Sequence, residues 1–347
     1  MRRGEPVAGN VALVEDWPEV GEPGLGEVRI RTLASAFNQM DLWVGRGVPG
    51  LELAYPRVSG CDACGVVEAV GEGVDGAWIG RRVIFNAAVA QPERGGPGDP
   101  TGATMTPIYQ LIGEHRNGAH AERFLAPADN IADVGETDAV EAAAYGLCFL
   151  TAWSGMVGKG RLRAGQRVLV TGIGGGVATS ALAIARHFGC AVAVTSRHGW
   201  KLERAKELGA DLGVLDEGQD WSRQVRAWTN GRGVDMAVDS SGKATHLNCI
   251  RSLGRGGAYI CPGATSGAEA TTDLVRLFWN QLRVLGTTMG TNDEFREVVA
   301  LLRARKLRPV VDEVFTPERC VEAYGRLEAG EQFGKVALRW GEGGERQ

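Results

Sequence analysis

The stretch "VLVTGIGGGVATSALAIA", residues 168–185, runs from an apolar strand pattern through a group of glycines directly into a helical pattern. The glycines of the turn are Gly172, Gly174, Gly175 and Gly176. Glycines let a backbone approach a pyrophosphate, whose charge then lies against unpaired amides of the helix that begins near Val177. Ala178 stands where a closing glycine is often found, so a simple tight turn is the alternative. The order of strand, glycine turn and helix predicts a dinucleotide-binding unit.

Five further apolar segments of strand length follow this motif and are separated by helical patterns. The six strand segments are 167–172, 190–196, 211–215, 234–242, 257–263 and 283–290. Parallel neighbours need crossover connections, and both faces of a parallel sheet must be covered. The alternation therefore predicts an α/β fold, a doubly wound six-stranded parallel sheet of the Rossmann type.

The first part of the chain, up to about residue 130, consists of short β-rich runs broken by glycine, which predicts a β-barrel-like unit. Residues 87–118 are dense in proline and glycine and predict a long surface excursion. The tail has more elements than the parallel sheet needs, and we assign it to the first domain. The predicted division is 1–149 with 287–347 for one domain and 150–286 for the other.

The composition narrows the classes of partner. A chain of 347 residues is long enough for about two domains. The formal net charge of -4 gives no overall attraction to nucleic acid or anionic lipid. No segment has the length and apolar character of a signal peptide or a membrane span, and seven cysteines are scattered without a framework. We expect a cytoplasmic protein with reduced thiols that binds neither nucleic acid nor membranes.

The segment about 20 residues beyond the glycines indicates which dinucleotide is bound. An Asp or Glu at this place usually holds the adenosine ribose 2′-hydroxyl. The sequence instead has Ser196, Arg197 and Lys201, a hydroxyl and two cations that suit a 2′-phosphate. This pattern predicts NADP(H) rather than NAD(H). In the alternative reading, Arg197 and Lys201 are solvated residues at the start of the next helix.

Motifs along nearly the whole chain resemble those of the medium-chain dehydrogenase/reductase superfamily. In chain order they include "GEVRIRT", "FNQMDLW", "GCDACGVVEAVG", "GAHAE", "GQRVLVTGIGGGVA", "GRGVDMAVDSSG" and "FGKVAL". Within the family the chain is most similar to the zinc-free quinone oxidoreductase and enoyl reductase branch. The resemblance implies a GroES-like β-barrel catalytic domain built from both chain ends, a Rossmann domain between them, and a homodimer or homotetramer joined through the Rossmann sheets.

The resemblance also indicates which positions of this chain would hold a catalytic zinc ion. Zinc members of the family hold the catalytic metal at the positions that here are Asn38, Cys61 and Leu147. Zinc needs three or four N, S or O donors, and a leucine side chain supplies none. We therefore predict that the protein uses no zinc. Cys61 and Cys64 are interpreted as small buried thiols, since no second ligand pair accompanies them.

A site without a metal favours acceptors that are already electron-poor. An enone or quinone accepts hydride at a conjugated carbon and delocalises the resulting charge, which hydrogen-bond donors can then stabilise. The predicted reaction is NADPH-dependent reduction of an activated C=C bond or quinone in a small hydrophobic, electrophilic acceptor. The alternatives are a zinc-free carbonyl reductase or alcohol dehydrogenase, and a non-catalytic NADPH-binding protein with a structural or regulatory role.

Candidate site residues come from the same motifs. Asn38 could donate from its amide to substrate or cofactor, or it could cap a loop. Tyr109 and His115 could supply a proton, or they could be ordinary surface or packing residues. The resemblance places Trp43 and Cys61 along the substrate channel. It places the following residues beside the cofactor: Thr151, Ser240, Gly263, Ala264, Thr265, Thr288 and Lys335.

Overall fold

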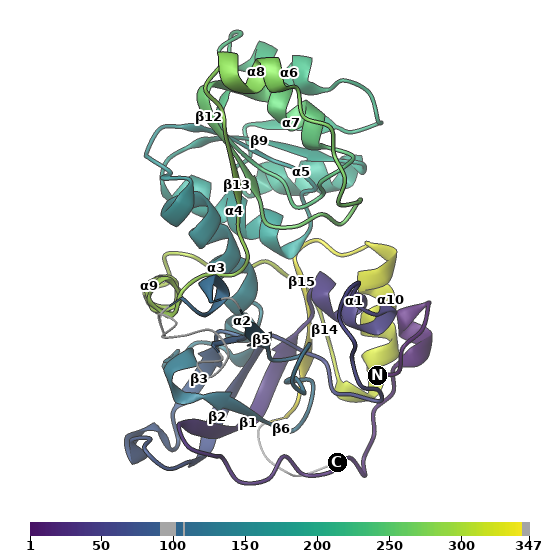
Figure 1. The fold of residues 1–347 in the computed structure, drawn as a ribbon, viewed down its shortest axis with the longest axis vertical. Coiled ribbons are helices and arrows are strands. Elements are labelled where there is room, and N and C mark those ends of the chain that lie inside the picture. The colour runs from purple at the N-terminus through teal and green to yellow at the C-terminus, as the bar shows by residue number, and fades with distance from the viewer. Residues whose placement is uncertain (91–101, 107, 342–347) are drawn as a thin grey trace. The chain divides into compact units, whose positions relative to one another are not determined.

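The structure, a computed structural model, describes residues 1–90, 102–106 and 108–341 (Figure 1). The chain forms two compact units. One contains Met1–Leu147 together with the chain from Thr291, and the other contains Cys148–Gly290. The chain therefore leaves the first unit, builds the second, and returns.

The second unit is a six-stranded parallel sheet with the strand order β10-β9-β8-β11-β12-β13. Its strands are β8 (Arg167–Val170), β9 (Ala191–Ser196), β10 (Leu212–Leu215), β11 (Val234–Val238), β12 (Leu253–Cys261) and β13 (Arg283–Gly286). Its connecting helices are α4 (Gly176–His187), α5 (Gly199–Glu207), α6 (Ser222–Trp228), α7 (His246–Ser252) and α8 (Leu274–Trp279). The order grows first to one side of β8 and then to the other, so the predicted doubly wound Rossmann sheet is confirmed.

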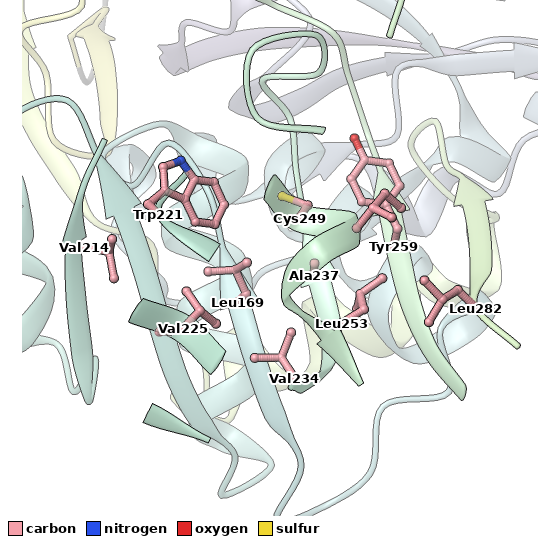
Figure 2. Close-up of a cluster of buried hydrophobic side chains, with 12 residues drawn as sticks. Leu169, Val214, Trp221, Val225, Val234, Ala237, Cys249, Leu253, Tyr259 and Leu282 are labelled. Atoms are coloured by element: carbon pink, nitrogen blue, oxygen red, sulfur yellow. The ribbon is translucent and has the colours of Figure 1, made fainter. Parts of the chain in front are cut away.

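One core of this unit lies where α6 and α7 pack on the sheet. Figure 2 shows Trp221, Val225 and Cys249 in one cluster with Leu169 and Ala237 of the strands, and all five are completely buried. Strands that are buried on both faces have nearly continuous apolar sequences, which is why these segments could be recognised. Replacing a buried tryptophan such as Trp221 by alanine would cost about 3 to 5 kcal/mol of stability.

The first unit is built on a seven-stranded sheet with the order β14-β15-β1-β2-β3-β7, in which β6 also pairs with β1. The strands are β1 (Glu27–Ala36), β2 (Ala63–Val70), β3 (Arg82–Phe85), β6 (Arg123–Pro127), β7 (Ile131–Asp133), β14 (Val311–Phe315) and β15 (Lys335–Arg339). The helices are α1 (Gln39–Arg46), α2 (Ala139–Ala143), α9 (Asn292–Arg303) and α10 (Cys320–Ala329). Short 3-10 helices are η1 (Val7–Asn10), η2 (Gly76–Trp78), η4 (Ala103–Met105), η5 (Ala128–Asn130) and η7 (Pro317–Arg319). Because β15 pairs with β1, the last strands of the chain extend the sheet that its first strands begin.

Three buried asparagines fix the point at which the chain re-enters the first unit. Asn86 Nδ2 donates to Asn292 Oδ1 (2.8 Å), and Asn292 Nδ2 donates to Asn130 Oδ1 (3.2 Å). Asn130 Nδ2 donates in turn to the carbonyl of Asn86 (2.7 Å). Buried amides are costly unless they are hydrogen-bonded, so this closed set holds the start of α9 against the end of β3.

One local element differs from the sequence-based expectation. Part of the expected surface excursion over 87–118 is a two-stranded antiparallel sheet of β4 (Ala88–Ala90) and β5 (Tyr109–Leu111). Residues 91–101 and 107 of that stretch lie outside the described residues. Strands of three residues are too short to show an alternating pattern, so the sequence does not predict them.

The cysteines and the apolar character of the helices bear on the expectations drawn from composition. The seven cysteines, all within the described residues, form no disulfide with one another. None of the helices that the structure describes has the length and apolar character needed to cross a membrane.

Candidate active site and cofactor site

Four buried polar residues meet in the first unit. Asn38 directly precedes α1, Cys61 and Asp62 directly precede β2, and Lys335 is the first residue of β15. Lys335 Nζ donates to Asn38 Oδ1 (2.6 Å) and to Asp62 Oδ2 (3.0 Å). Asn38 Nδ2 donates to Asp62 Oδ2 (2.9 Å) and to Cys61 Sγ (3.2 Å). We call these four residues the polar cluster.

Both the nitrogen and the oxygen of the Asn38 side-chain amide form hydrogen bonds within the polar cluster. An asparagine amide has two N–H donors, and here one is directed at Asp62 and the other at Cys61. Its oxygen accepts from Lys335. Donation from Asn38 to a substrate, as the sequence suggested, would therefore have to replace one of these two bonds.

Asp62 joins the polar cluster to the start of α3 (Gly146–Trp153). Its Oδ1 accepts a hydrogen bond from the backbone N–H of Leu147 (2.8 Å). A Cβ on Gly146 would lie 2.6 Å from the same oxygen, so this approach requires glycine. Leu147 thus contributes its backbone to the site, and its side chain offers no metal donor.

The donors of the polar cluster do not fit a zinc ion. One thiol and one carboxylate are present, and the carboxylate already pairs with the Lys335 ammonium at 3.0 Å. Zinc sites in proteins take three or four N, S or O donors, and a neighbouring cation repels the metal. In the part of the chain that the structure describes, no group of three or more His, Cys, Asp or Glu residues could hold a metal ion. That the protein works without zinc remains a prediction.

A second buried pair, Asp41 and His120, lies next to the polar cluster. The Asp41 carboxylate accepts from the backbone N–H of Asn38 (2.7 Å) and of Gly60 (2.9 Å), so it ties together the segments that carry Asn38 and Cys61. His120 Nε2 lies 3.7 Å from Asp41 Oδ1. Burial raises the pKa of Asp41 to about 7 and, with help from the Lys335 charge, lowers the pKa of His120 to about 3.

Cys64, the second cysteine of the "CDAC" motif, is a packing residue of β2. It is completely buried, and burial raises the pKa of its thiol to about 12. A thiol with so high a pKa stays protonated near neutral pH, whereas metal binding and redox exchange both require the thiolate. The interpretation of Cys64 as a structural thiol agrees with this environment.

The three remaining candidates of the first unit have different surroundings. His115 Nδ1 accepts a hydrogen bond from the backbone N–H of Leu111 (3.2 Å) and lies 3.3 Å from Glu114 Oε1. This ring nitrogen therefore stabilises the turn after β5. Tyr109 is half-buried at the start of β5. Trp43 is 38% exposed on α1. An exposed indole on a helix next to Asn38 is available to an apolar ligand.

In the second unit the glycine loop has the geometry of a phosphate cradle. Gly172 and Gly174 have φ angles of 61° and 111°, which disfavour side chains with a Cβ. α4 begins at Gly176, and its N-cap, Gly175, has no side chain to satisfy the first amides. These unpaired N–H groups and the positive end of the helix dipole fit the pyrophosphate of a dinucleotide. Val177 follows in the first turn of the same helix.

The three residues predicted to choose between NADPH and NADH lie at the end of β9 and the start of α5. Ser196 is buried, and its Oγ accepts from the backbone N–H of His198 (3.1 Å). Arg197 is exposed. Lys201 is buried beside the glycine loop, since a Cβ on Gly174 would lie 2.8 Å from Lys201 Cδ and 3.3 Å from its Nζ. The structure therefore brings Lys201 to the cradle.

The carboxyl ends of β11 and β12 bring together a further group of predicted residues. Thr265 donates from its backbone N–H to the carbonyl of Ser240 (3.2 Å). A Cβ on Gly263 would lie 3.4 Å from the same carbonyl oxygen, and Ala264 lies between Gly263 and Thr265. Ligands of open α/β sheets bind outside the carboxyl ends of the strands, which is where these residues lie.

Two predicted cofactor residues lie elsewhere in the second unit. Thr151 is buried within α3. Thr288 is exposed, two residues beyond the carboxyl end of β13.

A surface groove of about 910 Å³ in the first unit contains none of the predicted residues. It is lined by residues of η2, β7 and α9, among them Trp78, Ile131 and Val299. The candidate residues of the first unit therefore lie at the polar cluster and its neighbours, outside this groove.

Two family models match successive parts of the chain. Residues 24–136 match the family described as the alcohol dehydrogenase GroES-like domain, and residues 176–304 match the one described as zinc-binding dehydrogenase. The chain is 30% identical over 339 residues to the zinc-type alcohol dehydrogenase-like protein YogA of Leptosphaeria maculans, with 91% of each chain covered. It is 31% identical over 253 residues to a 2-haloacrylate reductase of Burkholderia sp, with 70% of this chain and 68% of the relative covered.

Among solved structures, one described as an NAD-dependent alcohol dehydrogenase matches with a TM-score of 0.90 and 38% identity, covering 98% of both chains. A Rossmann sheet with a glycine cradle, carried in one chain with a GroES-like domain, defines an oxidoreductase that uses a nicotinamide dinucleotide. The chain belongs to the medium-chain dehydrogenase/reductase superfamily, as its sequence motifs predict.

Proposed function

We propose that the protein is a zinc-independent, NADPH-dependent oxidoreductase that transfers hydride to an activated C=C bond or quinone of a small hydrophobic acceptor. The observation that carries this proposal is the polar cluster. Asn38, which stands at one of the positions where zinc members of the family hold the metal, is hydrogen-bonded to Asp62 and Lys335, and these two residues are also bonded to each other. Leu147, at another of those positions, adds only its backbone N–H.

The choice of acceptor follows from the chemistry of such a site. When bound, the reduced nicotinamide supplies the hydride. Reduction of a simple ketone develops alkoxide charge that a Lewis acid would normally stabilise. An enone or quinone spreads the charge over a conjugated system, so hydrogen-bond donors and the local field of a buried ammonium such as Lys335 suffice.

NADPH is proposed over NADH because of the residues after β9. Ser196, Arg197 and Lys201 provide a hydroxyl and two cations, and no carboxylate lies among residues 196–202 to repel a 2′-phosphate. The similar solved structure is described as NAD-dependent, and that description applies to that protein. Calorimetric titration with both reduced dinucleotides decides between them, and tighter binding of NADH would refute this part of the proposal.

A second candidate function is reduction of an aldehyde or ketone, or oxidation of an alcohol, by side-chain acids alone. The names of similar proteins support it, since YogA and the solved structure are both described as alcohol dehydrogenases or their relatives. The name of the 2-haloacrylate reductase supports the first candidate. Following NADPH absorbance with quinones, enones and aldehydes in parallel separates the two. Tight NADPH binding without turnover of any acceptor would indicate a binding protein instead.

We also propose that two copies associate through α8 and β13. Leu274, Val275, Phe278 and Trp279 of α8 are each between 65% and 68% exposed. β13 lies at the edge of the sheet, and its Val284 is 49% exposed. Burying an exposed apolar patch lowers the free energy of the protein, and an open strand edge has unpaired backbone groups. A second copy of the same surface can cover the patch and pair with the strand edge.

A further inference from the structure

The helix that follows α3 changes its hydrogen-bond register. Ser154–Lys159 form a π-helix, and the N–H of Gly160 donates to the carbonyl of Gly155 five residues earlier (2.8 Å). Such widened turns cost hydrogen-bond geometry and occur frequently at functional sites. None of the site residues predicted from the sequence lies in this segment.

The π-helix lies directly against the carboxyl ends of two strands of the same unit. A Cβ on Gly155 would lie 2.7 Å from Ile260 Cγ2 in β12 and 2.9 Å from Thr287 Cγ2, just beyond β13. No side chain fits at that distance, so Gly155 is required for the contact. The main chain of the π-helix therefore presses on the methyl group of Thr287.

Lys159, the last residue of the π-helix, holds the hydroxyl group of the same threonine. Its Nζ donates to Thr287 Oγ1 (2.7 Å) and to Ser154 Oγ (3.2 Å). Both acceptors are buried, with Thr287 8% and Ser154 2% exposed. Hydrogen bonds from an ionised donor are shorter and roughly twice as strong as neutral ones. Thr287 is thus fixed by Gly155 at its methyl group and by Lys159 at its hydroxyl.

The fixed threonine belongs to the ligand-binding edge of the parallel sheet. Its backbone N–H donates to the carbonyl of Cys261 (3.1 Å), which prolongs the pairing of β13 with β12. Thr288 is exposed between Thr287 and Met289, both of which are buried. Holding Thr287 therefore determines where Thr288 projects, at the edge where open α/β sheets bind their ligands.

We propose that Lys159 is a positioning residue for the cofactor: its ammonium fixes Thr287 so that the Thr287–Thr288 segment is ready to bind the nicotinamide end of the dinucleotide. This inference rests on the proposed function. Lys159 itself acts through Thr287. Its loss should affect the nicotinamide half of the cofactor and leave the adenosine half unchanged, because the glycine cradle and Lys201 do not depend on it.

The test is calorimetry on the full-length protein and on Lys159→Met, with NADPH and with 2′,5′-ADP, which lacks the nicotinamide. Loss of a charge-assisted hydrogen bond predicts that the NADPH Kd rises about tenfold while the 2′,5′-ADP Kd stays within about twofold. Lys159→Arg, which keeps the charge and the donors, should recover most of the NADPH affinity. Lys206→Met, on the exposed side of α5, is the matched control and should change neither Kd.

Equal changes for both ligands, or no change for NADPH, would overturn the inference. Thermal unfolding of each variant shows whether Lys159→Met still folds, and Lys159→Arg supplies the comparison if it does not. If the wild-type protein binds neither NADPH nor 2′,5′-ADP, the proposed NADPH dependence fails. In that case the Kd values of wild type and Lys159→Met are compared for NADH and for AMP, which lacks the nicotinamide. This comparison tests the role of Lys159 independently of the choice of dinucleotide.

Discussion

Lys335 Nζ lies 3.0 Å from Asp62 Oδ2, and the side chains of both residues are at least 97% buried. The two residues are 273 positions apart in the sequence, so this ion pair exists only because β15 joins the sheet begun by β1. A buried ammonium and a buried carboxylate each carry a large desolvation cost that is offset only by the partner. The pair is therefore both a structural link between the chain ends and the charged centre of the candidate site.

Asp62→Asn should be strongly destabilising, because it keeps the side-chain shape but leaves the Lys335 charge without its partner. We expect the free energy of unfolding, measured in urea, to fall by about 3 kcal/mol. The double variant Asp62→Asn with Lys335→Gln removes both charges and should recover part of this loss. A change below about 0.5 kcal/mol in the single variant would show that Lys335 is not charged in the folded protein.

His120→Phe should change how stability depends on pH. Because the pKa of His120 falls from 6.5 to about 3 on folding, the unfolded chain binds a proton in this range that the folded chain does not. Wild-type stability therefore rises with pH between about 3 and 6.5, and this contribution is lost as the pH falls. Phenylalanine cannot titrate, so the variant should gain stability relative to wild type by up to about 1.4 kcal/mol per pH unit below 6.5.

The quantity compared is the difference in free energy of unfolding between wild type and His120→Phe at each pH. Groups that titrate in the same way in both proteins cancel in this difference. Asp41, whose pKa is raised to about 7, contributes with the opposite sign in both. The hydrogen bond shared by His120 Nδ1 and Ser35 Oγ (2.9 Å) is lost at every pH and only shifts the curve. Parallel curves for wild type and variant would mean that His120 keeps its ordinary pKa in the folded state.

Arg197→Glu should exchange the dinucleotide preference. A carboxylate after β9 repels a 2′-phosphate and can accept from ribose hydroxyls. The NADPH Kd should rise about tenfold or more, and the NADH Kd should change by less than about threefold or fall. Arg204→Glu, farther along α5 and 58% exposed, is the control and should leave both constants unchanged. Equal effects of the two variants would mean that Arg197 acts only through net charge.

Phe278→Lys combined with Trp279→Lys should dissociate the protein. Sedimentation velocity is expected to show a dimer or tetramer for wild type and a monomer for the variant, because two charges cannot be buried in an apolar contact. Leu208→Lys changes an exposed apolar residue at the end of α5 and should leave the oligomer intact. A monomeric wild-type protein at micromolar concentration would contradict the proposed contact.

Much of the second unit could be predicted from the sequence. Its inner strands, such as β8 and β11, are largely buried and therefore appear as apolar runs. The glycines before α4 mark the cradle because residues with a Cβ rarely adopt its positive φ angles. The place of Ser196, Arg197 and Lys201, at the end of β9 and the start of α5, could be predicted because the βαβ unit fixes their distance from the glycines along the chain. Their role in choosing the dinucleotide stays a prediction.

The contacts of the first unit could not be predicted in the same way. The family resemblance implied a place beside the cofactor for Lys335, and the structure joins this residue to Asn38 and Asp62. Asp62 and His120 received no role, although a carboxylate and a histidine inside apolar segments are the kind of residue that burial perturbs. Their partners come from distant strands, and periodicity carries no information about which strands become neighbours. Lys159 was missed because a π-helix has no sequence pattern of its own.

The central claim is that hydride transfer to an activated acceptor proceeds in this protein without a metal. The most direct measurement is NADPH oxidation with a quinone and an enone by protein whose metal content is determined before and after dialysis against a chelator. We predict turnover of at least one of these acceptors, an unchanged rate after dialysis, and well below one zinc per chain. One tightly bound zinc per chain, with activity that disappears when it is removed, would contradict the account.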